Sequence, residues 1–383
     1  MHLYPQSTCD PARWHRMRLD LLSNHTALWL NVSQYAPQVA AADVTGHPFV
    51  MGETNSVSCG GRSGISDTFG AALWGVDYVL TAASVGIEKI YFHLGGNSEY
   101  SSFTPLGYPY KNETLEAGIR PGWYAHYFLA HVVRPLVRGG GAGAGERFEI
   151  AGLPSANSSS LSGFAVYGTP PIASLNSTKP GGGSTTAPRT RRATEQQQQP
   201  AGDAKTLRKL VLLDMGVWNG TAGLSNPSTL SVTDGTAFSP GSRPSSTFRV
   251  ATPWCPGRNA SVVRLQAPGT NAKSEVSVSG VTFDPLTGDV QASASASAGG
   301  GGLESEVVSV GEKGVVEIEV VRAQGVLLEM NDVSPCGGTS PGGGGGGGNG
   351  GTGAGTGAAG RNGPMAATWL LAVVMCAVGT FML

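Results

Sequence analysis

Residues 48–61 of the sequence, PFVMGETNSVSCGG, join a short apolar run to an acid and then to a loop of small residues. The apolar run, which ends at Glu53, is typical of a buried strand. Apolar residues then recur every three or four positions from Phe69 to Ala83, which predicts a helix that ends at Gly86. The next run, IEKIYFHLG (87–95), predicts a second strand. Strands that alternate with helices indicate βα units and a parallel sheet.

More helices are predicted on both sides of this unit. Asp10 followed by Pro11 predicts a helix that runs to about Ser23, and the stretches 26–42 and 121–137 are also predicted to be helical. The first residues resemble the exit of one further strand, so the predicted strands are too few to close a barrel. Residues 1–19 also lack the apolar segment of a secretory signal. We therefore expect the sequence to be the C-terminal portion of a longer protein.

The pattern changes after residue 138. Runs such as RFEIAG (147–152), RKLVLLDMGVW (208–218) and GVVEIEVVRAQGVLLEM (314–330) are rich in β-forming residues and separated by Gly, Pro, Ser and Asn. This pattern is typical of an antiparallel β-sandwich. The predicted fold class is therefore α/β plus all-β. The predicted divisions are the C-terminal part of a (β/α)8 TIM barrel (1–138), a β-sandwich (139–335) with a disordered insertion (171–203), a Gly-rich stalk (336–364) and a hydrophobic tail (365–383).

Charge and cysteine content limit the possible functions. The chain holds 25 Lys and Arg against 26 Asp and Glu, so it has no basic excess that would favour nucleic acid as a partner. No cysteine has metal-ligand spacing, and neither a metal nor a cofactor is predicted. Cys376 lies in the tail, and the other four cysteines permit three pairings. Pairing within each half joins Cys9 to Cys59 and Cys255 to Cys336, and we take this as the simplest expectation.

Two features predict an extracellular location. Seven Asn-x-Ser/Thr sequons occur, at Asn24, Asn31, Asn112, Asn157, Asn176, Asn219 and Asn259. The end of the chain, from Met365 to Leu383, is apolar and uncharged and follows a run of small residues. This pattern is typical of a GPI-attachment signal, and a tail anchor in the membrane is the alternative. We therefore expect a cell-surface protein.

The acid at the strand end is the candidate catalytic residue. In barrels of parallel strands the catalytic groups lie at the C-terminal strand ends, where Glu53 is predicted to be. Position alone also allows a glutamate that only caps a turn. Several motifs, however, resemble glycoside hydrolase family 79, the family of β-glucuronidases and heparanases, and in particular its secreted fungal members. These motifs are HLYPQSTC (2–9), MGETNSVSCGG (51–61), SEYSSFTP (98–105), LVLLDMGVWNGT (210–221) and VVRLQAPG (262–269).

The resemblance implies a (β/α)8 barrel that carries a β-sandwich and hydrolyses glycans with terminal glucuronic acid, with retention of configuration. It implies that Glu53, in the family's G-E-T-N/S motif, is the nucleophile and that Tyr4 orients it. His2 is then expected to line the cleft. The family's acid/base glutamate belongs to a fourth barrel strand, and these 383 residues contain no such strand.

Five further positions are predicted to contact the sugar. Small residues in the loop after Glu53 allow backbone N–H groups to approach the glucuronate carboxylate, and a nearby tyrosine adds a hydroxyl. These positions are Ser58, Cys59 and Gly60, continued by Gly61, and Tyr100. The alternative hypothesis is a non-catalytic cell-surface glycoprotein built on a remnant barrel and a β-sandwich.

Overall fold

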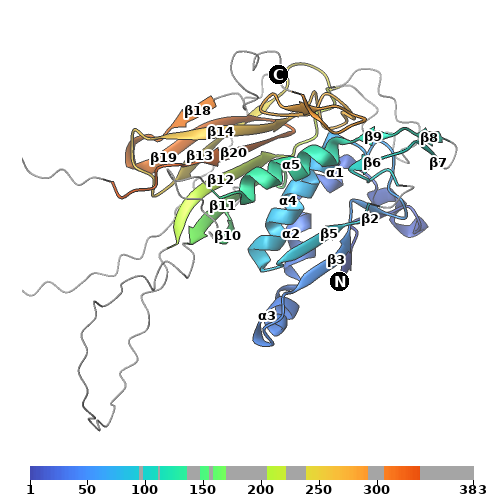
Figure 1. Cartoon of the computed structure of the whole chain (residues 1–383), viewed down its shortest axis with the longest axis horizontal. Coiled ribbons are helices and arrows are strands. Elements are labelled where there is room, and N and C mark those ends of the chain that lie inside the picture. The colour runs from blue at the N-terminus through green and yellow to red at the C-terminus, as the bar shows by residue number, and fades with distance from the viewer. Residues whose placement is uncertain are drawn as a thin grey trace, which may run out of the picture.

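The computed structural model describes residues 1–94, 98–110, 113–135, 147–154, 158–169, 205–220, 239–291 and 306–336 (Figure 1). The predicted insertion (171–203), nearly all of the predicted stalk, the hydrophobic tail and the sequons at Asn112, Asn157 and Asn176 lie outside these residues. Among the helices that the structure describes, none has both the length and the apolar character needed to cross a bilayer.

The N-terminal part is a three-stranded parallel sheet with helices against it. Its strands lie in the order β1 (His2–Leu3), β3 (Val50–Thr54) and β5 (Lys89–Phe92). The segment between β1 and β3 holds β2 (Gln6–Ser7), the 3₁₀ helix η1 (Pro11–Arg16), α1 (Leu19–Leu22), α2 (His25–Ser33) and α3 (Ala36–Val44). Helix α4 (Phe69–Val85) joins β3 to β5, and α5 (Pro121–Val133) follows. The predicted alternation of parallel strands and helices is therefore present.

Two predicted helices are broken in the structure. The side chain of Asp10 does cap η1 by accepting from the N–H of Ala12, but Arg18 is extended and separates η1 from α1. The predicted helix 26–42 is two helices, α2 and α3, that meet near Tyr35. Pro37 explains this second break, because proline has no N–H to continue the α2 ladder but fits the first turn of α3.

Helix α4 is the central element of the fold. Gly86 ends it in the left-handed region (φ 97°), as its position in the sequence predicts. Trp74 and Tyr78 lie on the face toward the parallel sheet and stack on each other, with ring centroids 5.1 Å apart. Leu73 and Leu80 belong to the opposite face, which packs against the C-terminal β domain. A helix buried on both faces is apolar over most of its surface, and Asp77, paired with His25, is the one charged residue of α4.

The C-terminal β domain consists of a large antiparallel sheet and a two-stranded layer. The large sheet has the order β10-β11-β12-β20-β14-β15, and β18 pairs with β14. Its strands are β10 (Arg147–Gly152), β11 (Leu161–Thr169), β12 (Thr206–Asp214), β14 (Asn259–Gln266), β15 (Ser277–Val278), β18 (Glu306–Ser309) and β20 (Gln324–Glu329). The second layer pairs β13 (Ser245–Ala251) with β19 (Val315–Val321).

Short two-stranded pairs complete the structure. They are β2 with β4 (Val57–Ser58), β6 (Phe103–Thr104) with β9 (Gly118–Ile119), β7 (Tyr108–Tyr110) with β8 (Glu113–Leu115), and β16 (Thr282–Phe283) with β17 (Val290–Gln291).

The two faces of the large sheet contribute side chains to two different hydrophobic cores. From β12, Leu210 and Leu212 face the β13–β19 layer and pack in one core with Phe248. Val211 and Leu213, which alternate with them, pack in the other core with α4 and α5. Because side chains of a strand alternate between faces, β12 is buried on both sides. The β domain and the helices of the N-terminal part therefore share one sheet.

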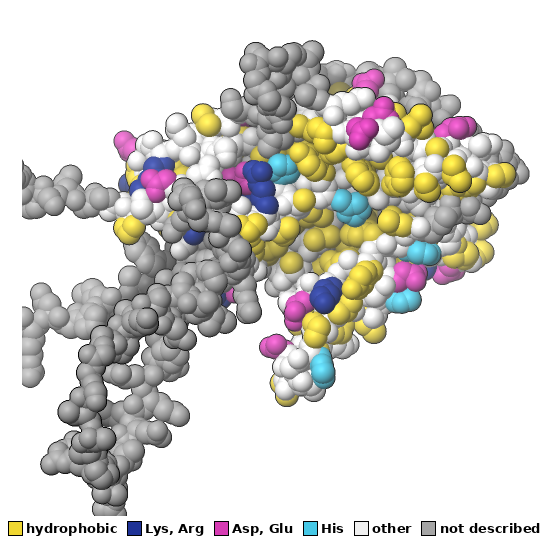
Figure 2. All heavy atoms as spheres, viewed as in Figure 1, with side chains coloured by type: hydrophobic (Ala, Val, Ile, Leu, Met, Phe, Trp, Pro, Cys, Tyr) yellow, Lys and Arg dark blue, Asp and Glu magenta, His cyan; other side chains and the backbone are white. Residues whose placement is uncertain are grey.

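An apolar groove runs between α5 and β5. It has a volume of about 770 Å³, and Tyr91, Leu94 and Val133 in its lining are each more than half exposed. Figure 2 shows hydrophobic side chains gathered on this side of the molecule, between the β domain and the parallel sheet.

Two disulfides are present, Cys9–Cys59 and Cys255–Cys336, which is the pairing expected from the sequence. Among the sequons in the described residues, Asn31 and Asn259 are exposed and Asn24 is partly exposed. Asn219, in contrast, is only 5% exposed. The folded chain does not present this side chain for a glycan, so the structure disfavours the prediction at Asn219.

Candidate active site

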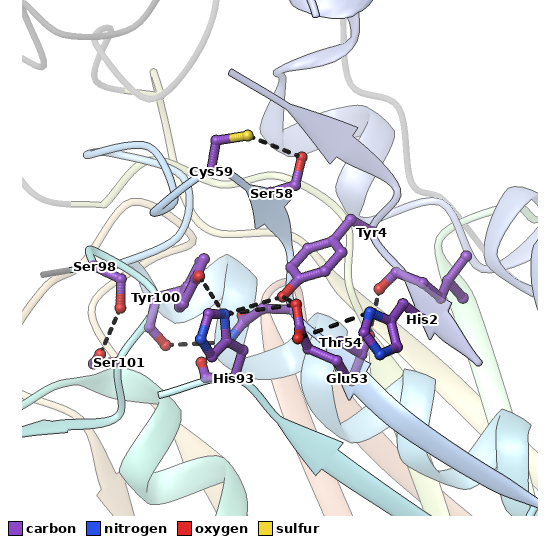
Figure 3. Close-up of polar contacts among 12 residues, drawn as sticks. His2, Tyr4, Glu53, Thr54, Ser58, Cys59, His93, Ser98, Tyr100 and Ser101 are labelled. Atoms are coloured by element: carbon purple, nitrogen blue, oxygen red, sulfur yellow. Dashed lines mark hydrogen bonds and ion pairs between the residues drawn. The ribbon is translucent and has the colours of Figure 1, made fainter. Parts of the chain in front are cut away.

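The parallel register places an acid and a phenol together at the carboxyl edge of the sheet. His2 of β1 pairs with Glu53 of β3, and Tyr4 follows directly after β1. The hydroxyl of Tyr4 donates to Oε1 of Glu53 at 2.7 Å (Figure 3). The sequence motif predicts this pair of residues, and the structure brings them into contact across 49 positions of the chain.

The surroundings of Glu53 favour its ionised form. The hydrogen bond from Tyr4 is the main reason that the pKa of Glu53 lies below its usual range. Desolvation opposes it, and nearby His93 and His2 lower the pKa further. Burial, and then the hydrogen bond to Glu53, raise the pKa of Tyr4. At neutral pH the pair is therefore a carboxylate that accepts from a neutral phenol. Such a carboxylate can attack an electrophilic carbon.

His93 is a site residue that the sequence analysis missed. Its Nδ1 lies 2.7 Å from the hydroxyl of Tyr100, 3.3 Å from that of Tyr4 and 3.8 Å from Oε1 of Glu53. The side chain of Asn55 donates to the His93 carbonyl at 3.0 Å and fixes the backbone there. His93 directly follows β5, the neighbour of the Glu53 strand. The rule that catalytic groups lie at the C-terminal ends of parallel strands, which identified Glu53, could therefore have identified His93 as well.

The predicted substrate-contacting residues Tyr100 and His2 differ in exposure. Tyr100 is 7% exposed, and it lies on the far side of His93 from Glu53 (Figure 3). The structure therefore makes Tyr100 a buried partner of His93, and its predicted contact with the glucuronate carboxylate stays a prediction. The side chain of His2 is 63% exposed, and its Nδ1 is 3.7 Å from Oε2 of Glu53. His2 thus lies beside the carboxylate on the solvent side.

The loop after Glu53 has an unusual backbone. Cys59, Gly60 and Gly61 have φ angles of 65°, 88° and 87°, so three consecutive residues lie in the left-handed region. The sulfur of Cys59 is bonded to Cys9, and the hydroxyl of Ser58 donates to Ser7, so these two side chains are used within the protein. The groups of this loop that remain for a ligand are backbone amides, which are the donors of anion-binding turns in general.

Gly61 is required by close packing. A Cβ at this position would lie 3.0 Å from the backbone nitrogen of Tyr100 and 3.1 Å from the side chain of Ser66. The loop is therefore pressed against the segment that carries Tyr100.

In the described part of the chain, no group of three or more His, Cys, Asp or Glu side chains could hold a metal ion.

The architecture matches that of known glycoside hydrolases. The crystal structure of a 4-O-α-L-rhamnosyl-β-D-glucuronidase from Fusarium oxysporum 12S aligns with a TM-score of 0.56 and 22% identity, covering 86% of this chain and 52% of that one. At this identity the likeness concerns the fold. Over the part that the alignment spans, the chain accordingly shares the fold of glycoside hydrolases that have a TIM-barrel-type domain and a C-terminal β domain.

Sequence comparison assigns part of the chain to a known domain family. Residues 201–327 match the model of the glycosyl hydrolase family 79 C-terminal beta domain, so the chain contains this domain. A β-glucuronidase of Neurospora crassa is 33% identical over 38% of this chain and 26% of its own length. A β-glucuronidase of Aspergillus niger is 27% identical over 81% of this chain and 47% of its own length. The predicted resemblance to family 79 is therefore confirmed, and the chain spans no more than about half of these relatives.

Proposed function

We propose that the chain is part of a retaining glycoside hydrolase of the β-glucuronidase type, with Glu53 as the nucleophile and Tyr4 as the residue that orients it. The observation that carries the proposal is the 2.7 Å hydrogen bond from Tyr4 to Glu53 at the carboxyl edge of parallel strands. The names of the fungal relatives supply the sugar class.

In the proposed mechanism, Tyr4 holds Oε1 of Glu53, and Oε2 attacks the anomeric carbon. The bond from that carbon to the leaving oxygen breaks as a second carboxylic acid protonates the oxygen, and water then hydrolyses the glycosyl ester. The two carboxyl groups of a retaining enzyme lie about 5–5.5 Å apart. Within the described residues, the polar partners of Glu53 are Tyr4, His93 and His2. We infer that the acid/base carboxyl lies outside this chain, in a region that corresponds to the part of the relatives without a match here.

The loop of residues 58–61 supplies a place for the carboxylate of the sugar. Its consecutive left-handed residues leave backbone amides as the donors that it can offer. His93 and His2 add imidazoles beside the same edge of the sheet. This combination favours a substrate that carries an acidic group on the same sugar ring as the reacting carbon, which supports a glucuronide over a neutral sugar.

We also infer an extracellular location. Two disulfides are typical of proteins that fold in an oxidising compartment, and Asn31 and Asn259 are exposed sequons.

The activity is tested on the complete gene product that contains this chain. We expect kcat/KM for 4-nitrophenyl β-D-glucuronide to exceed that for the matching β-glucoside by on the order of 10²-fold or more, because the glucoside leaves the anion-binding donors without a partner. The sugar first released should have the β configuration by NMR. A folded gene product that hydrolyses neither substrate would support the non-catalytic alternative.

The variant Tyr4→Phe tests the orienting role through pH dependence. The Tyr4 hydrogen bond lowers the pKa of Glu53, so its removal raises this pKa and the carboxylate becomes protonated at a higher pH. We expect the acidic limb of the kcat/KM profile to move to higher pH and the rate at the plateau to fall. A profile with an unchanged acidic limb would contradict the role. Tyr91→Phe is the matched control, because Tyr91 is 57% exposed on β5.

A further inference from the structure

A loop of the β domain is attached to the first turn of α4, immediately after the active-site loop. The N–H of Phe69 donates to the carbonyl of Ala272 at 2.8 Å, and the N–H of Gly70 donates to that of Thr270 at 2.8 Å. The first-turn N–H groups of a helix have no partner within the helix, so the β domain satisfies two of them. A Cβ at Gly70 would lie 2.7 Å from the Thr270 methyl group, which shows how closely the two segments pack.

The same β-domain loop contributes a cation to a buried acid. Nζ of Lys273 lies 2.8 Å from Oδ2 of Asp67 and also donates to Oγ of Ser63 at 2.8 Å. Asp67 is 7% exposed, and its other oxygen accepts from the N–H of Gly64 at 2.6 Å. A buried carboxylate requires a paired cation or several donors, and here Lys273 supplies the charge from the other domain.

A second set of hydrogen bonds joins Ser66, the residue before Asp67, to the loop after Glu53. Oγ of Ser66 accepts from the N–H of Arg62 at 3.0 Å and from the hydroxyl of Ser56 at 3.0 Å. Gly61 packs directly on Ser66. The segment from Ser56 to Asp67 thus holds strand β4 and a series of turns with hydrogen bonds between them. The ion pair with Lys273 holds the segment at Asp67, and the Cys9–Cys59 disulfide holds it at Cys59.

We propose that Lys273 is a positioning residue through which the β domain holds loop 58–61 in its anion-binding conformation. This role rests on the proposed function, because loop 58–61 is the proposed binding site of the glucuronate carboxylate. Lys273 acts through Asp67 and has no contact with the substrate. Loss of its charge therefore weakens binding of the glucuronate carboxylate, while the Tyr4–Glu53 pair, which lies at the ends of β1 and β3, keeps its geometry.

The kinetic test uses Lys273→Met in the complete gene product. We expect KM for 4-nitrophenyl β-D-glucuronide to rise about tenfold while kcat stays within about twofold, in the range seen when a coupled residue outside the site is changed. Asp67→Asn should give the same split, the double variant should add nothing further, and Lys273→Arg should restore most of the affinity. Arg249→Met is the matched control, because it breaks the exposed Arg249–Glu317 pair on the β13–β19 layer. A fall in kcat with KM unchanged would overturn the proposal.

Hydrogen exchange in the full chain gives a second readout that needs no activity. In Lys273→Met, the amides of residues 59–66 should exchange at least about tenfold faster, while those in the middle of α4 should keep their rates. Unchanged exchange in residues 59–66, or equal acceleration throughout α4, would overturn the proposal. Because this measurement does not depend on hydrolysis, it distinguishes failure of the Lys273 contact from failure of the proposed enzymatic function.

Discussion

Replacement of Glu53 by alanine is expected to lower hydrolysis of aryl β-glucuronides by the complete gene product on the order of 10⁴-fold or more, the scale seen when an enzyme loses its nucleophile. The side chain removed is the carboxylate that Tyr4 holds and that its neighbours keep ionised. Glu53→Gln should lose activity equally, since an amide cannot form the glycosyl ester. The measurement is kcat for 4-nitrophenyl β-D-glucuronide.

Sodium azide distinguishes the nucleophile from an acid/base residue. In Glu53→Ala the small anion can occupy the vacated space and attack the anomeric carbon from the face that the carboxylate used. Rescue with formation of the α-glucuronyl azide identifies Glu53 as the nucleophile, whereas the β-azide would assign it to the acid/base role. Glu88→Gln is the control, because Glu88 is exposed and immediately precedes β5, at the opposite edge of the sheet.

A second large effect is expected on stability, at a buried lysine that joins the two parts of the molecule. Lys209 of β12 is fully buried, and its Nζ donates to the carbonyl of His131 at 2.6 Å and to that of Arg134 at 2.9 Å. It also lies 3.1 Å from Oε1 of Glu329, whose other oxygen pairs with Arg134 at 2.8 Å. Lys209 therefore binds carbonyls at the C-terminal end of α5, which helix ends leave unsatisfied.

Lys209→Met should lower the free energy of unfolding by about 3 kcal/mol, because it leaves buried carbonyls without donors and Glu329 with one cation fewer. Denaturant unfolding of the full chain measures this change. Lys205→Met is the control: Lys205 pairs with Glu149 at the surface, and its loss should cost less than about 1 kcal/mol. Addition of Glu329→Gln to Lys209→Met should recover part of the loss. A Lys209 variant as stable as the control would refute this interpretation.

Local signals predicted the elements that have a regular pattern. Helix α4 was found because its apolar residues are periodic and Gly86 ends it, and most strands of the large sheet were found from their composition. Strand β18 was missed because it is short and follows a run of Gly and Ser. The broken helices at Arg18 and Tyr35 show the opposite error, in which a continuous pattern hid a change of direction.

The site was only partly predictable for a related reason. Glu53 and Tyr4 are identified by strand ends and by motif, and register alone brings them together. The roles of His93 and the burial of Tyr100 depend on how β5 and its following loop pack. Lys273 is separated from Asp67 by more than two hundred positions, so no local pattern indicates their contact. Contacts of this kind are properties of the packed domains and are not encoded in any one segment.

The double burial of β12 has a consequence for how the molecule folds and melts. Since its alternate residues belong to two cores, neither core can lose its packing without exposing one face of the strand that supports the other. The β domain is thus not an independent lobe, because separation from α4 and α5 would leave its large sheet with one bare apolar face. Unfolding is accordingly expected to be a single cooperative event. The boundary near residue 138 separates two sequence patterns, but the parts on its two sides share a hydrophobic core and are expected to unfold together.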